Sequence, residues 1–164
     1  MKFDEYYLKI AIAVREKANC KGRKVGAVIV KDNRVISTGY NGTPEGMSNC
    51  LDSGCYRCDS SSSKPGVDYD KCICVHAEQN AVLSAARFGI ALEGSTVYTT
   101  LEPCINCSKA MLQAKVKRVV YLRDFEYPEK EYKAQHKKLL DAFSGGVKRV
   151  TVDDPREKWA NNES

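Results

Sequence analysis

Two short motifs constrain this chain more than any other feature. The first is His-Ala-Glu at residues 76–78, and the second is Pro-Cys-Ile-Asn-Cys at residues 103–107. Each motif opens a segment whose composition predicts a helix, and a run of β-forming residues separates the two helices. Cys104 and Cys107 are three residues apart, so their sulfurs share one face of the first helical turns. Free N–H groups and the helix dipole at that end stabilise thiolates, the form of cysteine that binds metal.

The two motifs together predict a catalytic zinc site. His76, Cys104 and Cys107 give three protein ligands, and a catalytic zinc keeps its fourth tetrahedral position open for water. This pairing of motifs is the signature of zinc nucleobase deaminases, in which the glutamate acts as acid and base rather than as a ligand. Zinc lowers the pKa of water toward ~7. Glu78 would then carry the proton to ring N3 of cytosine and on to the leaving amine, giving a uracil base and ammonia.

The rest of the chain predicts an α/β fold. Apolar spacing predicts helices over residues 3–18, 77–88, 105–114 and 131–143. Val- and Ile-rich runs predict strands over residues 25–30, 34–40, 96–100, 117–122 and 147–152. This order predicts a three-layer α-β-α architecture with a mixed five-stranded sheet. We expect one deaminase domain over residues 1–152, carrying a Cys-rich insert at 43–74, followed by a polar tail at 153–164.

Cysteine usage indicates further metal ligation. The chain has eight cysteines and only two histidines. It begins without the basic-then-apolar layout of a signal peptide and has no apolar run near the ~20 residues of a membrane span. We therefore expect a cytoplasmic protein (in the host cytoplasm if phage-encoded) without a membrane partner. Its thiols would stay reduced and serve as metal ligands or core residues. A long loop without secondary structure is usually either functional or held together by internal cross-links. The cysteines around the insert favour such cross-links.

Charge gives a weaker constraint on partners. The net charge is +5, and the basic excess lies between residues 109 and 149. An anionic partner is consistent with this balance. The absence of a dense basic block or an aromatic-interleaved stripe argues against a long nucleic acid.

The sequence also resembles a known protein family. From its start to about residue 152 the chain resembles the deoxycytidylate deaminase branch of the cytidine deaminase-like superfamily. The matching stretches are residues 23–30, 39–44, 76–81 and 100–107. The resemblance implies hydrolysis of dCMP to dUMP for thymidylate synthesis, in a homo-hexamer. It also implies that Asn41 contacts the sugar.

The resemblance further implies allosteric control and a second metal. dCTP would activate and dTTP would inhibit, each bound with Mg²⁺ at a second site that uses Gly39, Tyr40, Asn41 and Gly42. A structural zinc, found in some members, would use the positions of Cys20 and Cys50. Cys74 is the first choice for its third ligand, and the set would be completed by Cys72, Cys55 or Cys58. A closed four-cysteine site would contribute folding energy directly.

The substrate itself demands two more contacts. A 5′-phosphate requires a cationic or N–H-rich cradle, and Arg23 and Lys24, just before the first predicted strand, are the candidates. An aromatic ring is expected to pack on the pyrimidine, and Tyr121 is the candidate lid. We assign no role to His136, which we expect on a polar helix face.

Three alternatives remain open. A tRNA adenosine deaminase, or another nucleic-acid deaminase, shares the zinc chemistry, but the stretch at 39–44 and the insert argue against it. A free cytidine deaminase would not need a phosphate cradle. A non-catalytic zinc scaffold would not need Glu78.

Overall fold

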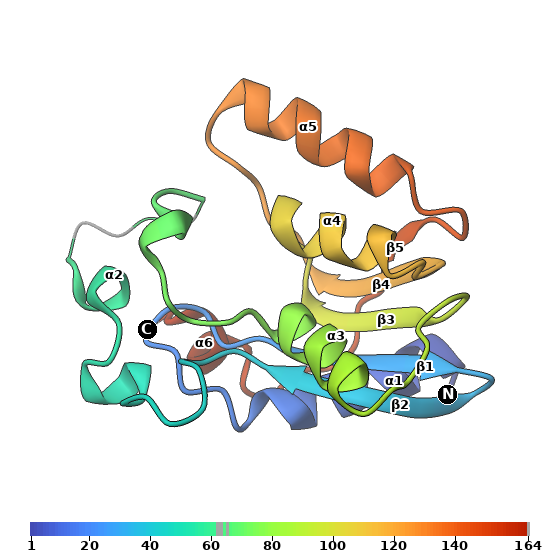
Figure 1. The fold of residues 1–164 in the computed structure, drawn as a ribbon, viewed down its shortest axis with the longest axis horizontal. Coiled ribbons are helices and arrows are strands. Elements are labelled where there is room, and N and C mark those ends of the chain that lie inside the picture. Colours follow the sequence, from blue (N-terminus) through green and yellow to red (C-terminus); the bar gives the residue numbers. More distant parts are fainter. Residues whose placement is uncertain (62–63, 65, 164) are drawn as a thin grey trace.

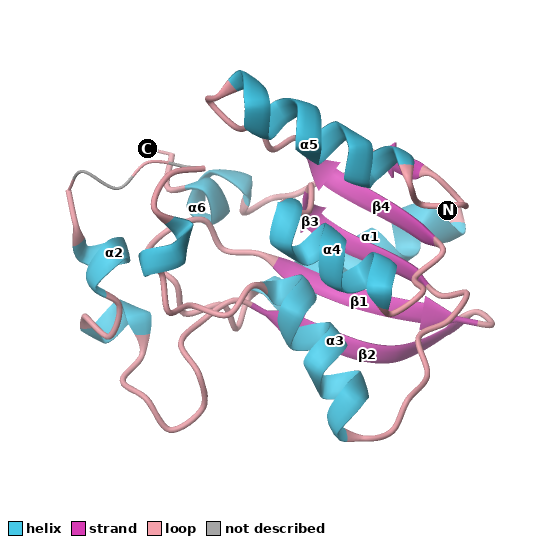
Figure 2. Cartoon of the chain, turned by 45° about the horizontal axis from the view of Figure 1, so that its top comes forward, coloured by secondary structure: helices cyan, strands magenta, loops and turns pink. Residues whose placement is uncertain are grey.

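A mixed sheet forms the middle layer of the molecule (Figures 1 and 2). The computed structural model describes every residue except 62–63, 65 and 164. The five strands are β1 (Gly26–Lys31), β2 (Arg34–Tyr40), β3 (Thr96–Leu101), β4 (Arg118–Arg123) and β5 (Val147–Arg149). Their order is β2-β1-β3-β4-β5; β1 runs antiparallel to both neighbours, and β3, β4 and β5 run parallel. The predicted mixed five-stranded sheet is confirmed.

The first two strands form a tight hairpin. Lys31 pairs with Arg34, so only Asp32 and Asn33 make the turn, and their φ angles are 49° and 58°. Two successive positive φ angles define the type I′ turn, which matches the twist of the strands and favours Asp and Asn.

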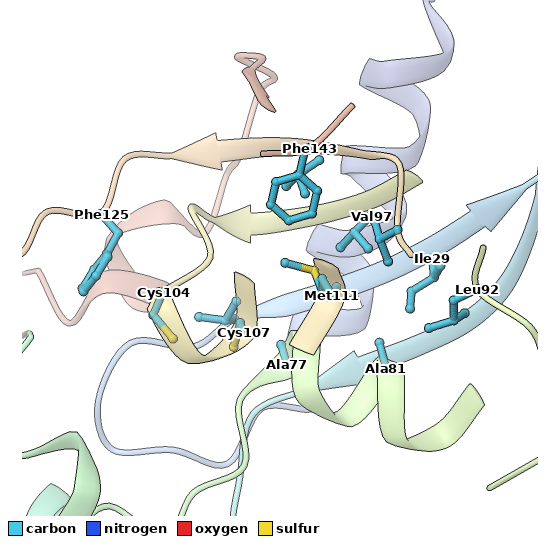
Figure 3. Packing of buried hydrophobic residues seen from close by; sticks show 14 of the residues in the cluster. Ile29, Ala77, Ala81, Leu92, Val97, Cys104, Cys107, Met111, Phe125 and Phe143 are labelled. Atoms are coloured by element: carbon cyan, nitrogen blue, oxygen red, sulfur yellow. The ribbon is translucent and has the colours of Figure 1, made fainter. Parts of the chain in front are cut away.

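Helices cover both faces of the sheet (Figure 2). On one face α1 (Phe3–Arg15) packs over Val28 and Val120. On the other face lie α3 (Ala77–Arg87) and α4 (Ile105–Gln113), with α5 (Lys130–Asp141) packed against α4. Figure 3 shows Cys107 and Met111 of α4 close to the start of α3, so the core reaches directly to the two motifs.

A glycine lets α3 approach the sheet closely. A Cβ at Gly39 in β2 would lie 2.2 Å from the Ala77 carbonyl oxygen and 2.5 Å from the Ala81 amide nitrogen. Any side chain at this position would push the first turn of α3 away from the sheet. The glycine therefore helps to fix the height of the His-Ala-Glu motif above the strands.

The insert folds into three short helical turns at the left in Figure 1. They are η1 (Cys50–Asp52), α2 (Tyr56–Asp59) and η2 (Tyr69–Lys71). An antiparallel bridge between Gly42 and Val75 joins the two ends of the insert. In the described part of the chain, the buried cluster at its centre consists of cysteines, which explains why this segment lacks apolar periodicity.

The C-terminal segment differs from the predicted polar tail. It contains α6 (Glu157–Asn161), and the Ala160 carbonyl accepts a 2.8 Å hydrogen bond from the Lys24 amide. Asp154 forms a bidentate pair with Arg15 of α1, at 2.7 and 2.8 Å, and both side chains are buried. Polar composition did not reveal that this segment packs on the domain, because its polar groups bond to residues of the domain rather than to water. No helix in the described part of the chain is long and apolar enough to cross a membrane.

Candidate active site

The predicted metal ligands converge at the starts of two helices. His76 caps α3 and Cys104 caps α4, and His76 Nδ1 lies 3.5 Å from the Sγ atoms of both Cys104 and Cys107. Zinc bonds of about 2.0–2.1 Å to nitrogen and 2.3 Å to sulfur, at a tetrahedral angle, place these atoms about 3.5 Å apart. The three donors therefore fit a tetrahedral zinc that keeps one open position.

The protonation states of the three donor side chains depend on one another. Although burial disfavours its protonated form, the Cys104 thiolate raises the pKa of His76 to about 9. Hydrogen bonding from Cys107, together with His76, lowers the pKa of Cys104 to about 4 despite burial. Hydrogen bonding with Cys104 and burial raise the pKa of Cys107 well above its usual value. A metal must displace the remaining protons, so its binding at this site is coupled to pH.

Glu78 is buried beside the three donors. Thr99 Oγ1 donates a 2.7 Å hydrogen bond to Glu78 Oε1, and Glu78 Oε2 lies 3.4 Å from Cys107 Sγ. Glu78 does not belong to the group of mutually close metal donors formed by His76 and the two cysteines. Burial raises the pKa of Glu78, which suits a group that must both take up and release a proton.

Two side chains hold the second motif from outside the metal site. His136 Nε2 donates a 2.7 Å hydrogen bond to the Pro103 carbonyl, and the Tyr127 hydroxyl accepts one of 3.0 Å from the Ile105 amide. His136 is only 6% exposed, so the expectation of a polar helix face was wrong. Its place between Tyr132 and Leu139 or Leu140, at helical spacing, is the sequence signal that we missed.

His76, Glu78 and Cys104 border a cavity of about 320 Å³. Its walls come from the end of β3, the insert and the C-terminal segment. Two aromatic side chains that sequence reasoning missed lie in these walls, Tyr69 and Phe125. The Tyr69 ring packs edge-on against His76 with centroids 5.7 Å apart, and it stacks with Phe125 at 6.2 Å. These two rings therefore bring aromatic surface into the cavity beside His76.

Tyr121 does not lie in this cavity. It borders a separate depression beneath α5, and its hydroxyl donates a 3.1 Å hydrogen bond to Asp124. Side chains alternate along a strand, so Tyr121 in β4 faces the α5 side instead of projecting from the strand end. The structure thus gives no support for Tyr121 as the lid.

The two predicted phosphate ligands have different surroundings. Arg23 is half-buried in the cavity wall, and its side chain has no hydrogen bond or ion pair to any described residue. Lys24 is not part of the wall; its ammonium contacts Asn162 and lies 5.6 Å from the centre of the Trp159 ring. Other cations in the wall are Lys21, Arg57 and Lys64.

Comparison with known proteins identifies the family. The model described as "Cytidine and deoxycytidylate deaminase zinc-binding region" matches residues 1–123. The chain belongs to this family.

Individual relatives agree with this family assignment. The chain is 44% identical to the deoxycytidylate deaminase of Schizosaccharomyces pombe, over 73% of this chain and 36% of that protein. It is 45% identical to the deoxycytidylate deaminase of Mycobacterium phage D29, over 74% of this chain and 95% of that protein. The chain therefore spans well under half of the yeast relative but matches nearly the whole of the phage relative.

A solved structure shows the same fold. It is the dCMP deaminase from the cyanophage S-TIM5 in complex with dCMP and dUMP. The two chains superpose with a TM-score of 0.66 and 33% identity, covering 93% of this chain and 99% of the other. This match confirms the deaminase-type α/β architecture predicted from the sequence.

The loop at 39–42 in this family member runs between two cavities. Asn41 lines the active-site cavity, where its Oδ1 accepts a hydrogen bond from the Val25 amide and its Nδ2 donates one to the Arg23 carbonyl, each 2.8 Å long. Asn41 therefore positions the segment that carries Arg23. Gly39, Tyr40 and Gly42 line a second depression of about 510 Å³ on the other side.

The remaining six cysteines meet in one place, although they are spread from residue 20 to residue 74. Cys20 and Cys50 lie together with Cys58 and Cys74, as a four-ligand site requires. Cys55 and Cys72 lie beside the same two residues, Cys58 and Cys74. The prediction left the fourth ligand open among three cysteines, and the structure brings all three to the cluster.

Proposed function

We propose that this protein is a zinc-dependent deaminase that converts dCMP to dUMP and ammonia. His76, Cys104 and Cys107 would hold the zinc, and Glu78 would carry the protons. The observation that carries this proposal is the position of Glu78, whose buried carboxylate adjoins the three donors without joining them. The phage and yeast deoxycytidylate deaminases support dCMP as the substrate.

Zinc, when bound, supplies a Lewis acid that makes water nucleophilic near neutral pH. Glu78 takes the proton from this water as the water oxygen bonds to C4 of the cytosine ring, and it delivers that proton to N3. Glu78 then takes the proton of the hydroxyl that has been added to C4 and transfers it to the exocyclic amine. The C4–N bond breaks to release ammonia, and the C4 oxygen becomes the carbonyl of the uracil ring. The Thr99 hydroxyl holds Glu78 Oε1 during these transfers, which keeps Oε2 beside the metal donors.

The cavity wall supports a nucleotide rather than a nucleoside. Arg23 presents a half-buried guanidinium without a partner among the described side chains, and charge-assisted bonds to phosphate are strong. Asn41 holds the backbone of the segment that carries Arg23 through its two side-chain hydrogen bonds. Its Nδ2 keeps a second N–H and its Oδ1 a second lone pair, which can bond to the sugar.

An assay of the purified protein against dCMP, cytidine and an RNA hairpin tests the substrate. We expect turnover of dCMP, with cytidine and the hairpin far poorer. Arg23→Gln should raise KM for dCMP about 10- to 100-fold, from the 1.5–3 kcal/mol of a hydrogen bond to a charged group. Lys24→Gln serves as the matched control and should leave KM nearly unchanged. Equal use of cytidine and dCMP, or a preference for the hairpin, would contradict the proposal.

We further propose allosteric control at the second depression, where dCTP with Mg²⁺ activates and dTTP with Mg²⁺ inhibits. The depression of about 510 Å³ formed in part by Gly39, Tyr40 and Gly42 supports this proposal. The Asn80 side chain donates a 2.7 Å hydrogen bond to the Tyr40 carbonyl, so this depression is joined to α3, which begins at the metal site. Kinetics with dCMP that stay hyperbolic and unchanged by either triphosphate would exclude this control.

We also propose that the chain assembles into a homo-hexamer whose dUMP product feeds thymidylate synthesis. Exposed apolar side chains within α3 and directly after it support an interface there. Leu83 is 58% exposed and Phe88 is 70% exposed, and clustered exposed apolar groups are typical of contact surfaces. Sedimentation analysis of the wild type and of Leu83→Asp tests the assembly. A wild-type monomer at micromolar concentration would contradict it.

A further inference from the structure

The insert encloses a compact cluster of six cysteine sulfurs. Within it, Cys20 Sγ lies 3.7 Å from Cys58 Sγ and 4.0 Å from Cys50 Sγ. Cys72 Sγ lies 3.8 Å from the sulfurs of both Cys55 and Cys58. The cluster is therefore continuous, with Cys58 in contact with both sides.

The six sulfurs divide into two overlapping quartets. One quartet is Cys20, Cys50, Cys58 and Cys74, and the other is Cys55, Cys58, Cys72 and Cys74. In each quartet all sulfurs lie within 4.8 Å of one another. Cys58 and Cys74 belong to both quartets, so neither quartet can be completed without the two shared residues.

The sulfur spacings fit metal ligation better than the other states of cysteine. Four sulfurs bound tetrahedrally at about 2.3 Å stand about 3.8 Å apart, which agrees with the measured 3.7–4.0 Å. Disulfide sulfurs are joined at about 2.0 Å. A core of six neutral thiols would bring no aliphatic side chain to hold the insert, because among the described residues the buried cluster contains cysteines alone.

We propose that these six cysteines bind two zinc ions as one binuclear cluster. Cys58 and Cys74 bridge the two ions, Cys20 and Cys50 complete the first site, and Cys55 and Cys72 complete the second. Each ion then has four thiolates, which is the closed coordination of structural rather than catalytic zinc. A single structural zinc would use one quartet and leave two sulfurs of the other without a metal.

Charge around the cluster supports this assignment. Six thiolates and two divalent ions leave a net charge of −2, which neighbouring cations and N–H groups must stabilise. The Lys21 amide lies 3.3 Å from Cys50 Sγ and donates to it. Iron–sulfur clusters fit less well, because inorganic sulfide would spread the cysteine sulfurs further apart than these distances.

The cluster would build one wall of the active-site cavity. Cys20, Cys58 and Cys72 line this cavity together with His76 and Glu78. Cys74 is also two residues before His76, so one short segment belongs to both metal centres. Two ions in the cluster would thus fix the loop that carries Arg23 and the turn that carries Tyr69 relative to the catalytic donors.

Metal counting on the intact, zinc-replete protein tests the proposal. We expect three zinc ions per chain by native mass spectrometry and elemental analysis, with no iron. X-ray absorption at the zinc edge should show a metal–metal scattering path, which only shared ligands produce. Cys107→Ser should lower the count to two and keep that path, because it alters the catalytic site alone.

Variants of the second quartet separate one structural ion from two. Cys55→Ser should lower the zinc count and remove the metal–metal path, whereas a single ion in the first quartet predicts no change in count. Two zinc ions or fewer in the wild type, iron in the cluster, or three ions without a metal–metal path would each overturn the proposal. Failure of the proposed function is separate, since a protein inactive on dCMP that still holds a coupled pair of zinc ions leaves this inference intact.

Discussion

Thr99 Oγ1 donates a 2.7 Å hydrogen bond to Glu78 Oε1, between the middle of β3 and the first turn of α3. Both residues are buried, with Thr99 at 0% and Glu78 at 4% exposure. The sheet therefore orients the carboxylate directly. This contact makes the position of the proposed proton carrier a property of the fold rather than of a mobile side chain.

Glu78→Gln should remove most turnover and keep the metal. The amide has nearly the same shape but cannot take up a proton, and general acid–base catalysis is worth about 10²–10⁴ in rate. We expect kcat for dCMP to fall by at least that factor while the zinc content measured by elemental analysis stays at the wild-type level. Glu93→Gln, which alters an exposed surface pair, is the control. Full activity in Glu78→Gln would exclude the proposed mechanism.

Thr99→Val should change the pH dependence of catalysis. Burial raises the pKa of Glu78, and the Thr99 hydrogen bond lowers it. Loss of this bond raises the pKa further, so the basic form is lost at a higher pH and the acidic limb of the kcat profile moves upward. Thr100→Val is a matched control, since the Thr100 hydroxyl accepts a bond from the Gly26 amide instead. An unmoved acidic limb in Thr99→Val would show that Thr99 does not act on Glu78.

His136→Phe should weaken zinc retention. It removes the 2.7 Å hydrogen bond to the Pro103 carbonyl, which adjoins the proposed ligand Cys104. Outer contacts of metal ligands are worth about 10- to 100-fold in affinity or activity, so chelator competition should show a loss in this range. His136→Gln keeps a donor and should recover part of it, and Gln135→Ala, at an exposed position, should change nothing. Equal chelator resistance in all three variants would contradict a positioning role.

Tyr69→Leu should impair substrate binding, and Tyr121→Leu should not. The Tyr69 ring lies in the cavity wall against His76, whereas Tyr121 lies in another depression beneath α5. Aromatic pairing is worth about 0.5–1.5 kcal/mol, which corresponds to a two- to tenfold rise in KM for dCMP. Tyr69→Phe keeps the ring and should resemble the wild type. A larger rise in KM for Tyr121→Leu than for Tyr69→Leu would instead support Tyr121 as the lid.

The sequence predicted the parts of this molecule that local patterns determine. The mixed five-stranded sheet and the gathering of His76, Cys104 and Cys107 follow from periodicity and from two motifs at helix starts, and both appear in the structure. Parts that depend on tertiary contact were missed. His136 and Tyr69 acquire their surroundings only when α5 and the insert pack against the motif loops.

The cysteines show the same limit in more detail. The family resemblance implied that Cys20, Cys50 and Cys74 share a site, but neither it nor the spacing of the cysteines gave a means of choosing a fourth ligand. The structure places Cys58 and Cys74 within reach of both remaining pairs, so it offers two overlapping sets of four cysteines. Cysteines can share ligand positions here only because three separate loops meet at one point. The spacing of residues along the chain does not predict such a meeting.

A buried ion pair ties the C-terminal segment to α1 and should contribute to stability. Asp154 and Arg15 are 139 residues apart in sequence and form two hydrogen bonds of 2.7 and 2.8 Å, with side-chain exposures of 1% and 3%. Removing one partner of a buried pair leaves an uncompensated charge and costs about 3–5 kcal/mol. Asp154→Asn should therefore lower the free energy of unfolding by roughly 3 kcal/mol in urea titrations, and Asp153→Asn, at an exposed neighbour, should change it little.

The pH dependence of this effect has a definite sign. Burial opposes ionisation of Asp154, but the hydrogen bonds and charge of Arg15 lower its pKa below the usual 3.8. A folded-state pKa below the unfolded value means that the stabilisation is complete above the unfolded pKa and is lost as pH falls through the folded one. The stability difference between wild type and Asp154→Asn should stay constant from about pH 7 to pH 5 and shrink below about pH 4. A difference that grew on acidification would show that the pair is not ionised in the folded protein.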